Sequence, residues 1–213
     1  MFKMSQVINF PALFYFPWVR FVRKNLTIPH LRVRDISRIN PEKLKQCGIK
    51  GIVFDKDNTL TIPYESSIHP RIQESFKHFC SVYKDQMVIC SNFAGTKDDL
   101  GYKKARKIED DLGISVLRHK QKKPGGIECV RDYFDCSLSE LVVFGDRIIT
   151  DVVFANKYGM LSILTEPLTE KENKAISKTR AYEVCLIDKF IARGIKAPKH
   201  KLDYNHICIK NFS

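Results

Sequence analysis

The chain has 213 residues, 44% of them hydrophobic, and carries 36 Lys and Arg against 24 Asp and Glu, a net charge of +12. This composition argues against wholesale disorder, and the length is typical of one well-buried domain rather than two. The excess of positive charge favours a polyanionic partner, such as nucleic acid, an anionic membrane or a phosphorylated substrate. The seven cysteines include no C-x-x-C pair and are expected to be reduced.

The first 45 residues form a basic and aromatic segment. Its stretch VINFPALFYFPWVRFVRK is interrupted by Pro11 and Pro17, and its apolar run is shorter than the roughly 20 residues that span a bilayer. Aromatic side chains interleaved with Arg are typical of the membrane–water interface. We therefore expect residues 1–45 to form a membrane-surface anchor and residues 46–213 to form the main domain. Two alternatives to a membrane anchor are that the segment packs against the main domain and that it directs import into an organelle.

Short apolar runs and helical periods alternate along the main domain. The runs, which predict strands, are residues 51–54, 87–90, 114–117, 141–144 and 160–164. Apolar residues that recur at helical spacing predict four helices. The first has Ile72, Phe76, Phe79 and Tyr83 after Pro70, and the second has Leu100, Ala105, Ile108 and Leu112 before Gly113. The third has Ile127, Val130 and Phe134 with Pro124 in its first turn, and the fourth covers residues 151–158 before Gly159. Alternation of this kind indicates an α/β fold with a parallel sheet covered on both faces. After about residue 166 the sequence predicts only a polar, basic helix and a tail, neither of which indicates any chemistry.

Polar side chains follow four of the predicted strands. Residues 51–54 lead into Asp55 and Asp57, and residues 87–90 lead into Ser91 and Asn92. The run 114–117 leads into RHKQKKPGG, which contains Lys123, and the run 141–144 leads into GDRIITD. Ligands of open α/β sheets bind outside the carboxyl ends of the strands, so these four loops are expected to line one crevice.

The acids in these loops predict a metal site. Asp55 and Asp57 lie on the same side of an extended chain, and Asp146 arrives from another strand end. Carboxylates at close quarters repel one another unless a cation lies between them, and hard oxygen ligands suit Mg²⁺. Lys123, Ser91 and the backbone N–H of Asn92 could then hold a phosphoryl group. We therefore expect metal-dependent chemistry on phosphate.

Other sites fit the sequence poorly. The stretch DKDNTL resembles the start of a calcium-binding loop, but Leu60 stands where glycine is needed and Ser66 where a bidentate Glu belongs. Ser91 lacks the G-x-S-x-G setting of a hydrolase nucleophile. The sequence contains neither a dinucleotide-binding nor a P-loop motif.

The ordered motifs resemble those of the haloacid dehalogenase superfamily of phosphatases. They are D-x-D-x-T-L at residues 55–60, Ser91-Asn92, Lys123-Pro124 and GDRIITD at 145–151, and the resemblance covers roughly residues 46–168. Their compact spacing resembles subgroup IIIA, and residues 28–61 resemble the mitochondrial phosphatidylglycerophosphate phosphatase family. The resemblance implies a Rossmannoid three-layer fold with a central parallel sheet and a minimal cap.

The resemblance also implies roles for the acids and the lysine. Asp55 would be the nucleophile that forms an aspartyl-phosphate, and Asp57 the general acid and base. Lys123 would offset the charge of the phosphoryl group. Asp146, Asp55 and the carbonyl of Asp57 would hold Mg²⁺, whereas Asp151 would orient Lys123 or metal-bound water.

Four further residues are implied at the substrate. Thr59 would brace the catalytic loop, Ser91 and Asn92 would bind the phosphoryl oxygens, and Arg147 would contact the substrate. Lys103, Lys104, Arg106 and Lys107 would add a basic field, unless they are only a solvated helix face.

The implied function is Mg²⁺-dependent hydrolysis of phosphatidylglycerophosphate to phosphatidylglycerol, a step in cardiolipin biosynthesis. This function implies an anionic phospholipid substrate, peripheral attachment to the matrix side of the mitochondrial inner membrane, and no nucleic-acid partner. Two alternatives use the same positive charge: a soluble phosphatase acting on nucleic-acid ends or phosphoproteins, and a binding module whose active site is spent.

Overall fold

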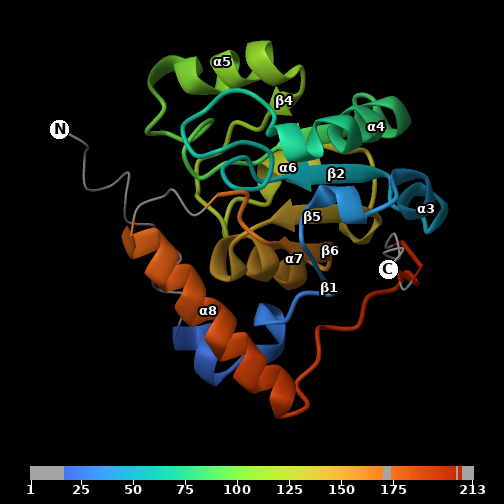
Figure 1. Cartoon of the computed structure of the whole chain (residues 1–213), viewed down its shortest axis with the longest axis vertical. Helices are drawn as coiled ribbons and strands as arrows, with labels where there is room; N and C mark the ends of the chain where they lie inside the picture. The colour runs from blue at the N-terminus through green and yellow to red at the C-terminus, as the bar shows by residue number, and fades with distance from the viewer. Residues whose placement is uncertain (1–16, 170–173, 205, 208–213) are drawn as a thin grey trace.

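A central parallel sheet organises the protein (Figure 1). The computed structural model describes residues 17–169, 174–204 and 206–207. The sheet has six strands in the order β1-β6-β5-β2-β3-β4, and every neighbouring pair is parallel. The strands are β1 (Leu31–Val33), β2 (Gly51–Phe54), β3 (Met87–Ile89), β4 (Ser115–Val116), β5 (Leu141–Gly145) and β6 (Leu161–Thr165). The expected parallel α/β sheet is confirmed.

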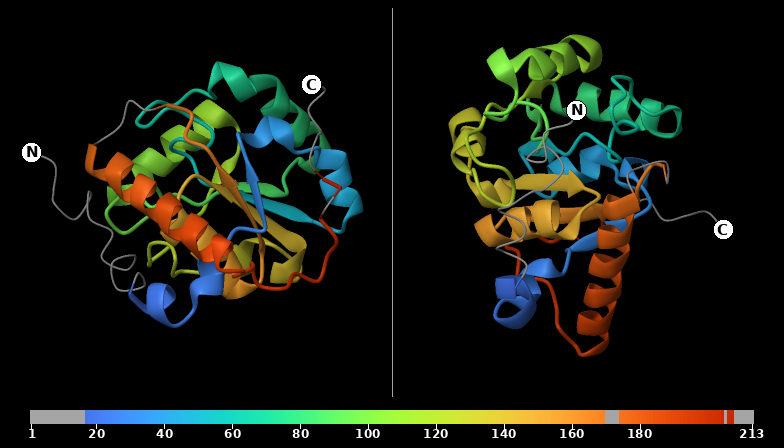
Figure 2. Two further views of the ribbon diagram at one scale, coloured as in Figure 1. Left: turned by 60° about the horizontal axis from the view of Figure 1, so that its bottom comes forward. Right: turned by 90° about the vertical axis from the view of Figure 1, so that its left-hand side faces the viewer.

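Helices cover both faces of this sheet (Figure 2). The α-helices are α3 (Pro41–Gln46), α4 (Gln73–Tyr83), α5 (Lys103–Leu112), α6 (Glu128–Tyr133), α7 (Val153–Tyr158) and α8 (Lys174–Ala192). The short helices are η1 (Lys24–Thr27), η2 (Ile36–Arg38), η3 (Pro70–Ile72), η4 (Leu100–Tyr102), η5 (Leu138–Glu140) and the π-helix η6 (Ile148–Val152). Helices α4 and α5 pack in one core layer, and α6 and α7 pack in the other.

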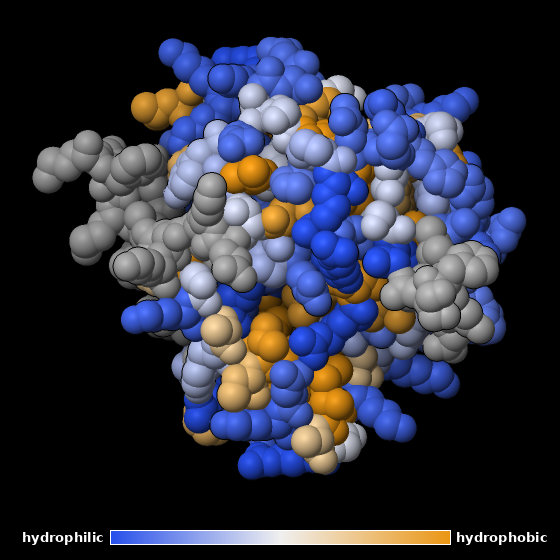
Figure 3. All heavy atoms as spheres, in the orientation of Figure 1, coloured by the Kyte–Doolittle hydropathy of each residue, from blue (hydrophilic) through white to orange (hydrophobic). Residues whose placement is uncertain are grey.

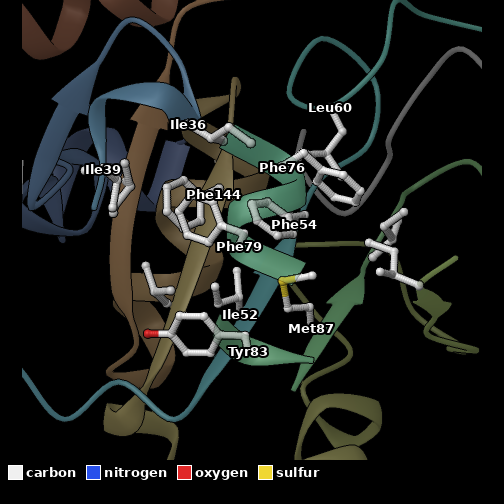
Figure 4. Packing of buried hydrophobic residues seen from close by; sticks show 14 of the residues in the cluster. Ile36, Ile39, Ile52, Phe54, Leu60, Phe76, Phe79, Tyr83, Met87 and Phe144 are labelled. Carbon is white, nitrogen blue, oxygen red and sulfur yellow. The ribbon is translucent and has the colours of Figure 1, made fainter. Parts of the chain in front are cut away.

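The alternation of side chains along the strands divides the core into these two layers. Phe54 of β2 and Phe144 of β5 face α4, where their ring centroids lie 5.2 Å apart and Phe79 packs edge-on against both (Figure 4). Val53 and Val143, one position earlier on the same strands, face α6 and α7. All four side chains are buried, which explains why the strand sequences are continuously apolar.

Two helices begin later than the sequence predicts. Leu100 was expected on the buried face of the second helix, but it is 82% exposed, because Gly101 and Tyr102 adopt positive φ and α5 begins only at Lys103. Pro124 was expected in the first turn of the third helix, which begins instead at Glu128. Both predictions were wrong because apolar spacing does not report the backbone conformation of the preceding loop.

The amino-terminal part of the described chain contributes to the fold. Strand β1, which the sequence did not predict, extends the sheet by pairing with β6. Val19, Leu26 and Ile28 are buried in a third core cluster together with the inner face of α8. The rest of the proposed anchor, residues 1–16, lies outside the described residues. Among the described helices, none is long and apolar enough to cross a membrane.

Candidate active site

Three acids, Asp55 half-buried and Asp146 and Asp151 buried, meet beyond the carboxyl ends of β2 and β5. Each of Asp55, Asp146 and Asp151 offers an oxygen, and these oxygens all lie within 4.8 Å of one another. The sheet register explains this, because Phe54 is paired with Phe144 and the chains leave the two strands side by side. The backbone N–H of Asp55 donates to the carbonyl of Phe144 at 2.8 Å, which fixes the start of the loop after β2 against β5.

Burial and mutual repulsion make two of these carboxylates, those of Asp55 and Asp146, hard to ionise. Burial, together with the charges of Asp55 and Asp151, raises the pKa of Asp146 to about 8, although Arg180 opposes the shift. Burial also raises the pKa of Asp55 to about 6, against the opposing charge of Lys123. A hard divalent cation would relieve the repulsion between these carboxylate oxygens, and the set of oxygen ligands fits Mg²⁺.

Lys123 is held between two of the acids. Its side chain is 1% exposed, and its ammonium donates to Asp55 at 2.8 Å and to Asp151. Burial alone would lower the pKa of Lys123, but the charges of Asp151 and Asp55 outweigh burial and raise it, so the ammonium stays charged. Asn92 positions this lysine, because its side-chain oxygen accepts the backbone N–H of Lys123 at 2.7 Å.

Asp57 and Thr59 lie on the loop that follows Asp55. The Asp57 carboxylate accepts the buried ammonium of Lys56 at 2.8 Å and the backbone N–H of Tyr64 at 3.4 Å, and it does not belong to the three-acid cluster. The Thr59 hydroxyl is buried and, within the described chain, has no hydrogen-bond partner. The loop therefore presents one acid that is held apart from the other three.

Ser91 organises the loop after β3. Its hydroxyl accepts the backbone N–H groups of Phe93 at 3.0 Å and Ala94 at 3.3 Å, which turns this loop toward the site. His119, a residue the sequence analysis did not single out, links this loop to the lysine loop. Its ring nitrogens lie 2.8 Å from the carbonyl of Ser91 and 2.6 Å from that of Gln121.

Asp151 lies within η6 and is fixed by contacts with two neighbouring loops. One of its oxygens accepts the backbone N–H of Arg147 at 3.1 Å and the other accepts Lys123. Gly145 makes this placement possible, since a Cβ on residue 145 would lie 2.3 Å from the carboxyl carbon of Asp151. Both oxygens of Asp151 are therefore engaged by protein groups.

Helix α8 reaches into the site from outside the motifs. Arg180, which is 9% exposed, donates to the carboxylate of Asp146. Glu183, which is 2% exposed, pairs with Arg147 at 3.0 Å and accepts the backbone N–H of Ile148 at 3.0 Å. Arg147, expected to contact substrate, thus has one of its two terminal nitrogens on Glu183.

Sequence reasoning missed Arg180 and Glu183 because it treated this helix as polar and without chemistry. A helical period could have found them, since Glu183, Ile187 and Phe190 recur at spacings of four and three, and Ile187 and Phe190 are buried.

Comparisons with known proteins agree with this geometry. The family model described as mitochondrial PGP phosphatase matches residues 18–169. The chain is 39% identical over 202 residues to a phosphatidylglycerophosphate phosphatase 1 of Arabidopsis thaliana, covering 93% of this chain and 58% of that protein. It is 36% identical to a mitochondrial phosphatidylglycerophosphatase of Saccharomyces cerevisiae over 60% of this chain and 76% of the relative.

The chain is also similar to a bacterial protein over nearly the whole length of that protein. The probable phosphatase YqeG of Bacillus subtilis is 30% identical over 173 residues, which cover 80% of this chain and 95% of that protein. The matched segment of the family model contains every proposed catalytic and metal-binding residue and ends before α8. The chain therefore belongs to the mitochondrial PGP phosphatase family.

Proposed function

We propose that this protein is a Mg²⁺-dependent phosphatase that hydrolyses the phosphate monoester of phosphatidylglycerophosphate to give phosphatidylglycerol. The observation that carries the proposal is the meeting of Asp55, Asp146, Asp151 and Lys123 at one rim of the sheet, in a chain of this family. Because the chain spans 58% of the length of its Arabidopsis thaliana relative, the activity is proposed rather than carried over from that protein's name.

In the first step, a carboxylate oxygen of Asp55 attacks the phosphorus of the monoester. The bond from phosphorus to the lipid oxygen breaks as the aspartyl-phosphate forms, and the carboxylic acid of Asp57 gives its proton to the departing oxygen. The contacts of Asp57 with Lys56 and with the backbone of Tyr64 fix this acid on the loop that carries the nucleophile, apart from the acid cluster, and the ammonium of Lys56 favours the carboxylate form that the second step needs.

In the second step, Asp57, now a carboxylate, takes a proton from water. The water oxygen attacks the phosphorus, the bond to Asp55 breaks, and inorganic phosphate leaves with the carboxylate of Asp55 restored. Lys123 balances negative charge throughout, since its ammonium lies between Asp55 and Asp151.

Asp55, Asp146 and the carbonyl of Asp57 would hold Mg²⁺, which supplies charge stabilisation for phosphoryl transfer when it is bound. Asp151 would orient Lys123 or metal-bound water. Arg180 supports the set by holding one oxygen of Asp146 in place.

The phosphoryl oxygens would be bound by Ser91, Asn92 and Lys123, while Thr59 and Arg147 complete the surroundings. The unpartnered hydroxyl of Thr59 is a donor available to the catalytic loop or its ligand. Arg147 would add positive charge from beside Asp146, held there by its contact with Glu183.

A substrate panel tests this proposal. Phosphate release is measured from phosphatidylglycerophosphate, phosphatidate, a phosphopeptide and a 3′-phosphorylated oligonucleotide. We expect the highest kcat/KM with phosphatidylglycerophosphate and loss of all activity when Mg²⁺ is chelated. Faster release from the oligonucleotide or the phosphopeptide would favour the alternative of a soluble phosphatase.

The variant Asp55→Asn tests the nucleophile. It should abolish phosphate release and leave the melting temperature at or above that of the wild type, because it removes a charge from a repelling cluster. Turnover retained by Asp55→Asn would eliminate Asp55 as the nucleophile. Activity absent from the wild type on every substrate would instead support the binding-module alternative.

We further propose that the protein attaches to a membrane through a surface formed by Trp18, Phe21, Val22, Tyr182 and Ile191, here called the aromatic surface. These side chains are between 37% and 71% exposed. Hydrophobic atoms gather over α8 in the lower part of the molecule, bordered by hydrophilic ones (Figure 3). The guanidinium of Arg20 lies 5.4 Å and 5.9 Å from the ring centroids of Phe21 and Tyr182, so cations and rings alternate as they do at lipid headgroups.

Liposome flotation tests the aromatic surface. The variant Phe21→Glu should float less with anionic liposomes than the wild type, because it replaces an exposed ring with a charge that anionic lipid repels. Leu100→Glu is the matched control, since Leu100 is 82% exposed on η4, outside this surface. Equal flotation of the two variants would contradict attachment through the aromatic surface.

The relatives' names support a mitochondrial location. Those from Saccharomyces cerevisiae and Schizosaccharomyces pombe are named as mitochondrial, and the one from Arabidopsis thaliana as chloroplastic or mitochondrial. We propose the matrix side of the inner membrane, where the protein would meet its lipid substrate as a peripheral enzyme.

A further inference from the structure

Two aromatic rings and a lysine form a cluster beside the proposed acid. The ring of Tyr64 packs edge-on against that of Phe93 with centroids 5.9 Å apart, and the ammonium of Lys104 lies 3.7 Å from the centroid of Phe93. Both distances are within the ranges of favourable aromatic and cation–π contacts. The three residues come from the loop after β2, the loop after β3 and the first turn of α5.

Backbone hydrogen bonds connect this cluster to the reacting groups. The N–H of Tyr64 donates to the carboxylate of Asp57 at 3.4 Å, and the N–H of Phe93 donates to the hydroxyl of Ser91 at 3.0 Å. Asp57 is the residue proposed to protonate the departing oxygen. The cluster therefore lies on the side of the site from which the leaving alcohol departs.

The backbone of Tyr64 is strained. It has a φ of 69° and its side chain is 70% exposed. A positive φ in a bulky non-glycine residue is uncommon and costs on the order of 1 kcal/mol or more. A strained backbone that presents a ring to solvent beside a catalytic acid suggests that the ring contacts a ligand.

Lys104 differs from the other basic residues of its helix. Lys103, Arg106 and Lys107 are exposed, whereas Lys104 is half-buried on the ring of Phe93. Within the described chain its ammonium makes no ion pair. Other cations around the site are already paired with carboxylates: Lys56, Lys122, Lys123, Arg147 and Arg180. Lys104 is thus a positioned positive charge that is available to an anion.

We propose that Tyr64, Phe93 and Lys104 form a leaving-group site in which Lys104 binds the phosphodiester of the substrate. This inference rests on the proposed function. Phosphatidylglycerophosphate loses its monoester from an alcohol that carries a second, ionised phosphate, whereas the alcohol released from phosphatidate is a neutral diacylglycerol. A single ammonium on the leaving-group side distinguishes these two alcohols, and the rings of Tyr64 and Phe93 flank the glycerol carbons.

The variant Lys104→Met tests the inference, because it keeps the length of the side chain and removes its charge. We expect kcat/KM for phosphatidylglycerophosphate to fall by about tenfold to a hundredfold, the range for loss of a hydrogen bond to a charged group. Rates on phosphatidate and p-nitrophenyl phosphate, whose leaving groups carry no phosphate, should stay unchanged. Lys107→Met, on the exposed face of the same helix, should change none of the three rates.

The outcomes separate this inference from the proposed function. Equal losses on all three substrates, or no loss on phosphatidylglycerophosphate, overturn the leaving-group site. If the wild type hydrolyses p-nitrophenyl phosphate but not phosphatidylglycerophosphate, the proposed function fails and the inference fails with it. Phe93→Leu, which removes the support under Lys104, should reduce only the rate on phosphatidylglycerophosphate; a loss on all three substrates argues against the site.

Discussion

The contact between Glu183 and the loop after β5 is expected to be a large single contributor to stability. Glu183 is 2% exposed in its side chain, and its partner Arg147 is 23% exposed. Removing one member of a buried ion pair costs about 3–5 kcal/mol, because the other charge stays buried without a partner. The N–H of Ile148 would also lose its acceptor. Since Arg147 retains some contact with water, we expect Glu183→Ala to lower the free energy of unfolding by about 3 kcal/mol.

Thermal or urea unfolding measures this loss. For a chain of this size, 1 kcal/mol corresponds to about 2–4 °C, so the melting temperature should fall by about 6–12 °C. Asp188→Ala is the matched control on the same helix. Its ion pair with Arg32, at 2.7 Å, joins side chains that are 54% and 44% exposed, and an exposed pair contributes less than about 1 kcal/mol.

A third variant identifies the cause of the loss. In Arg147→Met/Glu183→Leu both charges are gone, so this double variant should be more stable than Glu183→Ala. If Glu183→Ala loses no more stability than Asp188→Ala, the pair does not anchor α8 and the reasoning is refuted.

Two further predictions concern a glycine and a histidine. Gly145→Ala should lower kcat by about a hundredfold without unfolding the protein, because its Cβ displaces Asp151. Gly113→Ala should keep kcat, because its Cβ meets nothing within 4 Å, although the φ of 70° at this position makes the variant less stable. Equal rates of the two variants would refute the requirement for glycine at residue 145. His30 accepts the backbone N–H of Ser162 at 3.1 Å, and burial with the nearby charge of His200 lowers its pKa to about 4. The unfolded chain therefore binds this proton first as the pH falls below about 6.5, and stability should decrease between pH 6.5 and pH 4 by up to about 3 kcal/mol. Urea unfolding of the wild type and His30→Gln at pH 7 and pH 5 checks this, and equal losses on acidification would contradict it.

The strands were predictable because burial on both faces leaves a strong signal in the sequence. The predicted runs at 51–54, 87–90, 141–144 and 160–164 agree with β2, β3, β5 and β6 to within one residue at either end. β1 was not predicted, because a three-residue edge strand is too short to show a period. Its partner β6 lies more than a hundred residues later, so only the folded chain shows that they pair.

The sequence by itself determined the central strands of the sheet and the order of the polar loops that follow them, because apolar periodicity and local spacing are short-range properties. Tertiary structure alone decided three further contacts around this site. Arg180 on Asp146, Glu183 on Arg147 and Lys104 on Phe93 join positions that no local pattern relates. The physical reason is that long-range ion pairs and ring contacts depend on how the helices dock against the sheet, and docking is fixed by burial of the whole core rather than by any single segment.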